Sequence, residues 1–365
     1  MDRARGRPRR PGPRLPGRAR RRAVPPRPGG PPVTWLTLRQ FRLSALGVTA
    51  LLVAVAAVLL AVGRPVALPT SPGLDPGDST YYYLGIVALH VFPALVGAFW
   101  GAPLISREVE HGTHRLVWNQ GVTRTRWLAV KAGVTASAAV VATGLLSLLV
   151  MWWSAPVDAI ATENGPAALP VEPMIFGARG VVPLAHAVFA FALGVTASAL
   201  LRRTVPAMAV TLVLFTAFQV GALNLVRPNL IPPEQELRQF SAEGTVFYYY
   251  GPSAPFELRV PVPERSWVLE QQTLDRAGNP TPVPAWFSEC LFPGGLESAT
   301  PPGPNREEER EACFDRLNAE GYHQRVTHQP NSRFWALQWA ETGLYLALAA
   351  LLGWFTLRWT NRRIG

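Results

Sequence analysis

Residues 107 to 131 hold the densest group of side chains in the middle of the chain that could do chemistry. Two histidines, His111 and His114, and two carboxylates, Glu108 and Glu110, lie within seven residues, and such side chains are common zinc ligands. Their spacing matches neither H-E-x-x-H nor H-x-x-E-H. Arginines on both sides would repel a cation, so the pattern favours a charged surface helix with local ion pairs over a metal site.

The segments around this group determine the fold class. Only 16% of the 365 residues are charged, whereas about 25% is usual for soluble domains. A bilayer-spanning helix needs about 20 apolar residues, and six windows are long enough. We therefore expect an all-α polytopic membrane protein with six transmembrane helices rather than a soluble protein with buried helices. The six windows are 43–63, 84–106, 132–153, 180–201, 205–226 and 336–357.

Basic residues between the windows predict the orientation. They concentrate after the second, fourth and sixth windows, and basic loops stay on the cytoplasmic side. Both termini are therefore expected to be cytoplasmic, and the long stretch between helices 5 and 6 is expected outside. The expected parts are a disordered tail 1–33, a membrane domain 34–226 with the cytoplasmic loop 107–131, an extracytoplasmic segment 227–335, and a last helix with the C-terminus, 336–365.

The net charge of +11 does not indicate a nucleic-acid partner. The Pro- and Gly-rich tail 1–33 contains 11 Arg and one Asp, which leaves only +1 for the rest of the chain. A polybasic tail of this kind can bind anionic lipid head groups, and an unselected extension is the alternative. After the tail, Trp35, Leu38 and Phe41 recur at helical spacing. They predict an interfacial amphipathic helix at 35–45 or, alternatively, the first turns of span one.

The segment between helices 5 and 6 is predicted to fold as a small α+β unit. Residues 244–251 and 256–271 have strand composition, and residues 305–321 have the acidic first turn and closing glycine of a helix. Both cysteines, Cys290 and Cys313, lie in this segment. An oxidising compartment favours a disulfide between them, and two free thiols are the alternative.

Few polar side chains lie inside the six windows. Ionisable groups within a membrane are functional candidates, and those in the windows are His90, His186 and Glu341. His90, Glu341 and the polar neighbour Gln219 are therefore candidate pathway residues. His186 is interpreted as an interhelical hydrogen-bond partner. Gly97 and its partner four residues later form a G-x-x-x-G pattern that permits close helix packing.

The loop between the second and third windows resembles that of a known family. Its pattern, Arg-Glu-x-Glu-x-Gly-Thr from residue 107 and Thr-Arg at 123–124, resembles ABC transporter permeases of the type 2 exporter class, over residues 35–365. The resemblance implies that 107–124 is a coupling helix docking on a cytoplasmic ABC ATPase subunit and that 35–45 is a connecting helix. Gly121, where such loops often carry Pro, and the size of the outer segment depart from the family pattern. The implied docking residues are Arg107, Glu108, Glu110, His111, Gly112, Thr113, Arg115, Thr123, Arg124 and Lys131.

The residues themselves argue against an ATPase site in this chain. A P-loop needs Gly-Lys-[Ser/Thr], but the only lysine, Lys131, lies between Val130 and Ala132. We therefore expect no enzyme activity and no cofactor in this chain, with ATP and Mg²⁺ bound by the partner subunit. The use of Arg rather than Lys is typical of actinobacterial membrane proteins and indicates a bacterial plasma membrane.

The expected function is that of a permease subunit that exports a hydrophobic or amphipathic substrate, as a homodimer or paired with another permease in the lipid bilayer. A receptor or sensor that uses the outer segment as its ligand module is an alternative. A secondary transporter is a further alternative, although it would need several acidic relays, and only Glu341 lies deep in a span.

Overall fold

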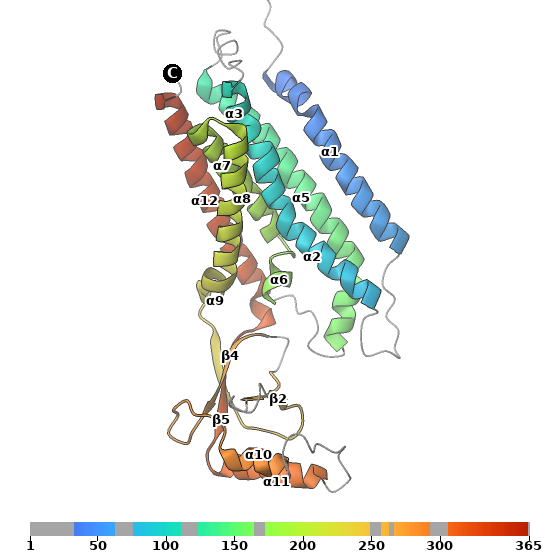
Figure 1. Cartoon of the computed structure of the whole chain (residues 1–365), viewed down its shortest axis with the longest axis vertical. Helices are drawn as coiled ribbons and strands as arrows, with labels where there is room; N and C mark the ends of the chain where they lie inside the picture. Colours follow the sequence, from blue (N-terminus) through green and yellow to red (C-terminus); the bar gives the residue numbers. More distant parts are fainter. Residues whose placement is uncertain are drawn as a thin grey trace, which may run out of the picture.

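The computed structural model describes residues 33–62, 76–110, 123–163, 172–248, 257–262, 266–292 and 306–363. The chain is mostly helical, with long helices side by side and an α+β lobe at one end (Figure 1). We call the described parts of residues 231–333 the lobe. The end of the helical bundle next to it is the lobe end, and the opposite end, where α3 and the end of α12 lie, is the docking end.

Most of the helices coincide with the predicted spans. Among the described residues, five segments are long and apolar enough to cross a membrane: Thr80–Glu110, Thr125–Pro156, Val182–Leu201, Thr204–Leu230 and Asn331–Arg362. The helices of the bundle are α1 (Val33–Val62), α2 (Pro76–Val96), η1 (Gly97–Gly101), α3 (Pro103–Glu110), α5 (Arg124–Glu163), α6 (Pro173–Phe176), α7 (Val182–Leu201), α8 (Thr204–Gly221), η2 (Ala222–Val226), α9 (Arg227–Leu230) and α12 (Phe334–Arg363).

The first predicted span lies in α1, whose start agrees with the second of the two alternatives predicted for residues 35–45 and not with the connecting helix that the resemblance implies. The described apolar part, Leu46–Val62, is shorter than the five long segments. Residues 35–45 are not a separate connecting helix but the first turns of α1, which continues without a break from Val33 to Val62. The sequence from Thr34 to Leu46 contains no Pro or Gly that would end a helix there.

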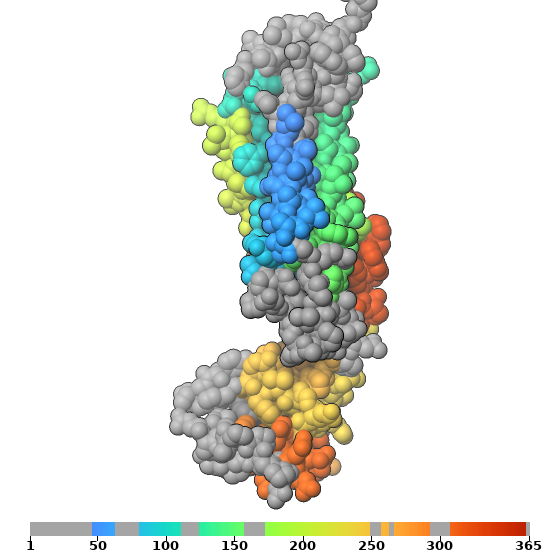
Figure 2. Space-filling model, turned by 90° about the vertical axis from the view of Figure 1, so that its right-hand side faces the viewer, coloured from blue at the N-terminus to red at the C-terminus, as the bar shows by residue number. Residues whose placement is uncertain are grey.

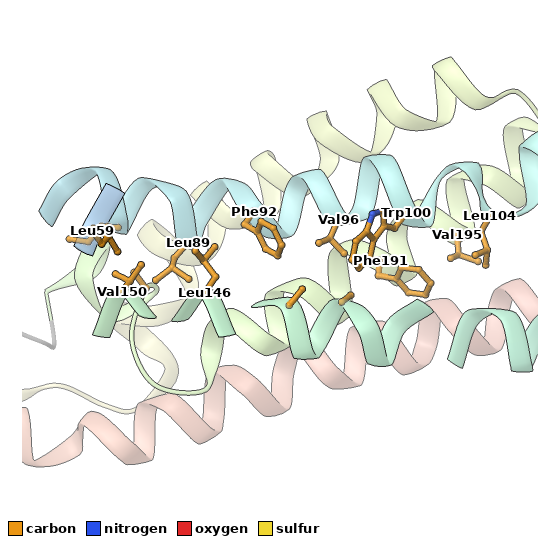
Figure 3. Packing of buried hydrophobic residues seen from close by; sticks show 14 of the residues in the cluster. Leu59, Leu89, Phe92, Val96, Trp100, Leu104, Leu146, Val150, Phe191 and Val195 are labelled. Atoms are coloured by element: carbon orange, nitrogen blue, oxygen red, sulfur yellow. The ribbon is translucent and has the colours of Figure 1, made fainter. Parts of the chain in front are cut away.

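Helix α7 forms the centre of the bundle because its residues are apolar on all sides, as expected of a buried helix. A row of buried side chains on α2, η1 and α3, including Phe92, Val96 and Trp100, packs against Leu146 of α5 and Phe191 of α7 (Figure 3). The space-filling view shows α1 lying over one face of the bundle (Figure 2).

The predicted glycine pattern permits a very close helix crossing. A Cβ atom on Gly194 of α7 would lie 2.2 Å from the carbonyl oxygen of Gly97, and one on Gly101 would lie 2.6 Å from the carbonyl oxygen of Phe191. Glycines on both helices are therefore needed for the backbones of η1 and α7 to touch.

The start of α7 is held by a glutamine from α12. Gln338 Oε1 accepts hydrogen bonds from the backbone N–H groups of Val181 (3.0 Å) and Val182 (3.2 Å), and Gln338 Nε2 donates to the carbonyl oxygen of Phe176 (3.1 Å). Gly180, with φ +63°, lies against this side chain, where a Cβ would be 2.6 Å from Oε1. One buried side chain thus satisfies amides that have no partner within the helix and fixes the short helix α6 beside α7.

The lobe is an α+β unit, as the sequence predicted. One sheet has the strand order β1-β5-β4 and the other pairs β2 with β3, all antiparallel. Cys290 and Cys313 form a disulfide with Cα atoms 6.1 Å apart, between two helices of the lobe. The elements are β1 (Glu234–Arg238), β2 (Val246–Tyr248), β3 (Glu257–Arg259), β4 (Trp267–Leu274), α10 (Ala285–Leu291), α11 (Arg306–Ala319), β5 (His323–Gln329) and η4 (Asn331–Arg333).

Candidate functional site

Helix α3 at the docking end opens the segment that the sequence predicted as the ATPase-docking loop. The chain leaves the described residues after Glu110 and returns at Thr123, just before α5. His111, Gly112, Thr113 and Arg115 lie outside the described residues, and of Arg124 only the backbone is described. The described docking candidates therefore flank the loop on α3 and α5, and Arg107 is exposed there.

Glu108 and Lys131 tie α3 to α5. Their side chains form an ion pair, each about 12% exposed, and Lys131 Nζ also donates to the carbonyl oxygen of Leu104 (3.2 Å). The ammonium lies 5.2 Å from the ring centroid of Trp127. The only lysine of the chain therefore fixes two helices to each other, a role that the sequence did not predict for it.

Glu110 bonds to the start of α8. Its Oε1 accepts from the backbone N–H of Thr204 (3.1 Å) and its Oε2 from the Thr204 hydroxyl (2.6 Å). A carboxylate at a helix N-terminus satisfies an amide that has no partner within the helix and interacts favourably with the helix dipole. Glu110 therefore joins the docking loop to the fifth predicted span.

Ser106 extends these contacts to α7. The backbone N–H groups of Ile105 and Ser106 donate to Ser198 Oγ at 3.2 and 2.7 Å. Ser106 Oγ lies 3.0 Å from the hydroxyl of Thr204. Through residues of α3, the start of the docking loop is thus bonded directly to α5, α7 and α8, so a displacement of α3 would be transmitted to three helices.

A buried ion pair lies at the lobe end. Arg227, the first residue of α9, donates through Nε and Nη2 to the two carboxylate oxygens of Glu341 on α12, each bond 2.8 Å long. Arg227 also donates to the carbonyl oxygen of Pro173 and lies 4.7 Å from the ring centroid of Phe176. Arg227 is 3% exposed and Glu341 1%, so both charges are removed from solvent and depend on each other.

Two other aromatic groups surround this pair. His186 Nε2 of α7 lies 3.5 Å from Glu341 Oε1, which is longer than a hydrogen bond. The ring of Tyr345 packs edge-on against the His186 ring at 4.5 Å between centroids. The His186 Nδ1 atom and the Tyr345 hydroxyl have no hydrogen-bond partner among the described residues.

The other predicted pathway residues lie beside the pair. His90 Nδ1 donates to the carbonyl oxygen of Ile86 (2.9 Å), and Gln219 Nε2 donates to the carbonyl oxygen of His90 (3.5 Å). A Cβ on Gly177 would be 2.8 Å from His90 Nε2 and 3.3 Å from Arg227 Nη2, so His90 and the ion pair share the glycine as a neighbour. The structure thus gathers His90, His186 and Glu341 at one level of the bundle.

Arg227 is the member of this group that sequence reasoning missed. The sequence placed it as the first residue of the outer segment, but the helix continues through Leu230 and Arg227 is buried inside the bundle. The signal was present: a lone acid in a span, Glu341, requires a partner, and Arg227 directly follows an apolar window.

Metal binding has no support among the described residues, where no three His, Cys, Asp or Glu side chains are grouped so as to hold an ion. His111 and His114, two of the four side chains considered above as metal ligands, lie outside those residues.

The comparisons with known proteins agree with the resemblance carried by the docking loop. No curated protein and no solved structure matches the chain. Residues 74–227 match the family model described as ABC-2 membrane transporter related, a range that runs from the start of α2 to Arg227 and contains the whole docking loop. This match, which covers 154 of the 365 residues, and the five long apolar helices among the described residues support a multi-pass membrane protein related to ABC-2 membrane transporters.

Proposed function

We propose that the chain is the membrane-spanning subunit of an ATP-driven exporter and that a separate cytoplasmic ABC ATPase docks on residues 107–124. The observation that carries the proposal is the family match across residues 74–227. The bonds from α3 to α5, α7 and α8 support it, because a docking element must pass force to the spans.

In this proposal the docking end faces the cytoplasm and the lobe lies outside. Exposed arginines at the docking end support this orientation, since basic residues favour the cytoplasmic side. They are Arg107, Arg126, Arg202, Arg203 and Arg362. The two lobe cysteines form a disulfide, which fits an oxidising exterior. The proposed location is a bacterial plasma membrane. Two such subunits, either identical or paired with another permease, enclose the pathway.

A hydrophobic or amphipathic molecule is the proposed substrate class. A groove of about 370 Å³ between α5, α7 and α12 supports this class, because its lining is almost entirely apolar. Lining residues from the three helices include Ala136, Phe191 and Leu346.

The test is co-purification of the tagged full-length chain with an ABC ATPase subunit co-expressed from the same genome. Arg107→Glu combined with Arg126→Glu should reduce the captured ATPase by about tenfold or more, because charge reversal within an interface costs more than 1.4 kcal/mol. Both side chains are exposed, Arg107 within the proposed docking segment and Arg126 two residues after its end. Arg362→Glu on α12, an exposed arginine at the same end, is the matched control and should leave the captured amount unchanged.

Capture of the ATPase by the folded double variant at the wild-type level would refute docking on residues 107–124. Absence of any ATPase from the wild-type complex, with every candidate subunit tested, would refute the exporter function itself.

A further inference from the structure

The outer ends of the fifth and sixth predicted spans are tied together from the bundle into the lobe. Within the bundle, Arg227 and Glu341 join α9 to α12. Just beyond it, Gln329 Nε2 donates to the carbonyl oxygen of Ile231 (2.6 Å), and Arg333 binds Glu234 Oε1 (2.6 Å). These contacts continue directly into the antiparallel pair β1–β5. Separation of α9 from α12 therefore requires the buried ion pair to break.

A π-helical turn stands directly before Arg227. Over η2, Ala222–Val226, the backbone follows π spacing, and the N–H of Arg227 donates to the carbonyl oxygen of Ala222, five residues back. A π-turn contains one residue more than an α-helical turn, and such turns frequently occur at functional sites. If the π-turn moves along the helix to a position beyond Arg227, Arg227 rotates by about 100° around the helix axis and shifts by about 1.5 Å along it. The guanidinium then no longer faces Glu341.

Little packing opposes such a shift. Of the five residues of η2 only Ala222 is buried, and Leu225 is 72% exposed. The preceding α8 also exposes large apolar side chains, among them Val213 and Val220. Rotation of this part of the helix exchanges one exposed apolar side chain for another, and the core contacts at stake in η2 are those of Ala222 and Val226.

Near the pair lie buried polar groups that make no hydrogen bond in this conformation. The Tyr345 hydroxyl, the Thr342 hydroxyl and His186 Nδ1 are buried and have no hydrogen-bond partner among the described residues. Buried polar groups without partners are rare and require an explanation. A second arrangement, in which water enters beside Glu341, would satisfy them.

We propose that Arg227 and Glu341 form a releasable lock at the lobe end of the bundle, which opens when the π-turn η2 shifts its register. The structure is the closed state of this lock. Its use as the outer gate of an exporter rests on the proposed function, whereas the lock itself is a property of this chain alone.

The test uses a single reporter cysteine in the full-length protein in lipid nanodiscs. Thr342→Cys introduces a buried thiol next to Glu341. It replaces a threonine whose hydroxyl makes no hydrogen bond among the described residues. The two native cysteines are bonded to each other. The rate of labelling by a polyethylene glycol maleimide, which does not enter the bilayer, reports how often the lock opens.

Two further variants are expected to change this rate in opposite directions. Glu341→Gln removes one charge of a buried pair and should raise the labelling rate by roughly 100-fold. Deletion of Leu225 removes the extra residue of the π-turn while Arg227 still faces Glu341, so labelling should be slower than with the reporter alone. Glu243→Gln, an exposed carboxylate of the lobe, is the matched control and should leave the rate unchanged.

Three results would overturn the lock. They are fast labelling of the reporter alone, labelling of folded Glu341→Gln at the rate of the Glu243 control, and labelling of the deletion variant at or above the reporter rate. If Glu341→Gln does not fold, Arg227→Lys replaces it, since lysine keeps the charge but loses the two parallel bonds; unchanged labelling of that variant also overturns the lock. None of these rates depends on the ATPase, so failure of the proposed function leaves the result readable.

Discussion

The close crossing of η1 and α7 predicts that adding a single methyl group there destabilises the protein. In Gly194→Ala the new Cβ would lie 2.2 Å from the carbonyl oxygen of Gly97 and 2.9 Å from the backbone nitrogen of Ala102. Both contacts are with backbone atoms, so no side chain can rotate away to make room. The two helices must separate, and the buried contacts along their crossing are weakened.

Two opposing effects set the magnitude. Alanine in place of glycine within a helix gains about 1 kcal/mol of intrinsic propensity. Forcing a methyl group into a packed site costs about 1–3 kcal/mol, occasionally more, and a contact of 2.2 Å with a backbone oxygen belongs at the upper end of that range. The net expectation is a loss of about 1–2 kcal/mol in the free energy of unfolding.

The assay is reversible unfolding of the full-length protein by sodium dodecyl sulfate in mixed micelles, followed by circular dichroism. Gly133→Ala on α5 is the matched control, because a Cβ there meets no atom within 4 Å. That variant should be as stable as the wild type or more stable. If Gly194→Ala unfolds at the same detergent fraction as Gly133→Ala, the close crossing is not present in the protein.

Three further outcomes follow from single contacts. Cys290→Ser should destabilise the lobe by about 3 kcal/mol, detected as faster proteolysis of the lobe, whereas the wild-type chain should resist alkylation without reductant. Gln338→Leu leaves the N–H groups at the start of α7 without a partner and should cost about 1–3 kcal/mol in detergent unfolding, while Gln235→Leu, exposed on β1, should cost little. Glu110→Gln removes a charge from the start of α8 and should cost about 0.3–1 kcal/mol; it should also reduce the stimulation of the bound ATPase without releasing it.

The sequence predicted the parts of the fold that depend on long apolar runs. Windows two to six all appear as helical segments, because apolar length is a strong signal. The helix at the third window, α5 (Arg124–Glu163), extends eight residues before and ten residues beyond the expected bounds, 132–153. The α+β character of the segment between helices 5 and 6 was also predicted. Its strands β1 and β5 were not, because "EQELR" and "HQRVTHQ" are polar and carry little strand signal. Their pairing is a long-range event that joins residues about 90 positions apart.

The candidate site was predicted only in part, and for a physical reason. Sequence spacing identifies which residues share a helix face, but it does not show which helices are neighbours. Glu108, Glu110 and Lys131 were placed together as a docking surface, yet their side chains bond to other helices of the same chain. Arg227 was excluded from the bundle because a charge normally ends a span, and its partner Glu341 lies 114 residues away.

The two π-helical turns in the described part of the bundle differ in what surrounds them, and the difference assigns them different roles. In η1 four of five residues are buried, and its backbone touches α7 where even a methyl group would not fit. A register shift there would drive side chains into the backbone of Ala190 and Phe191, so this turn is fixed by packing. In η2 only one residue is buried, and the turn ends at a charged side chain whose partner lies on another helix. The same backbone irregularity is therefore fixed by packing in η1, whereas in η2 it is free to shift its register. If both deletions, of Phe99 from η1 and of Leu225 from η2, reduced stability equally, this distinction would be wrong; we expect the deletion in η1 to prevent folding and the deletion in η2 to preserve it.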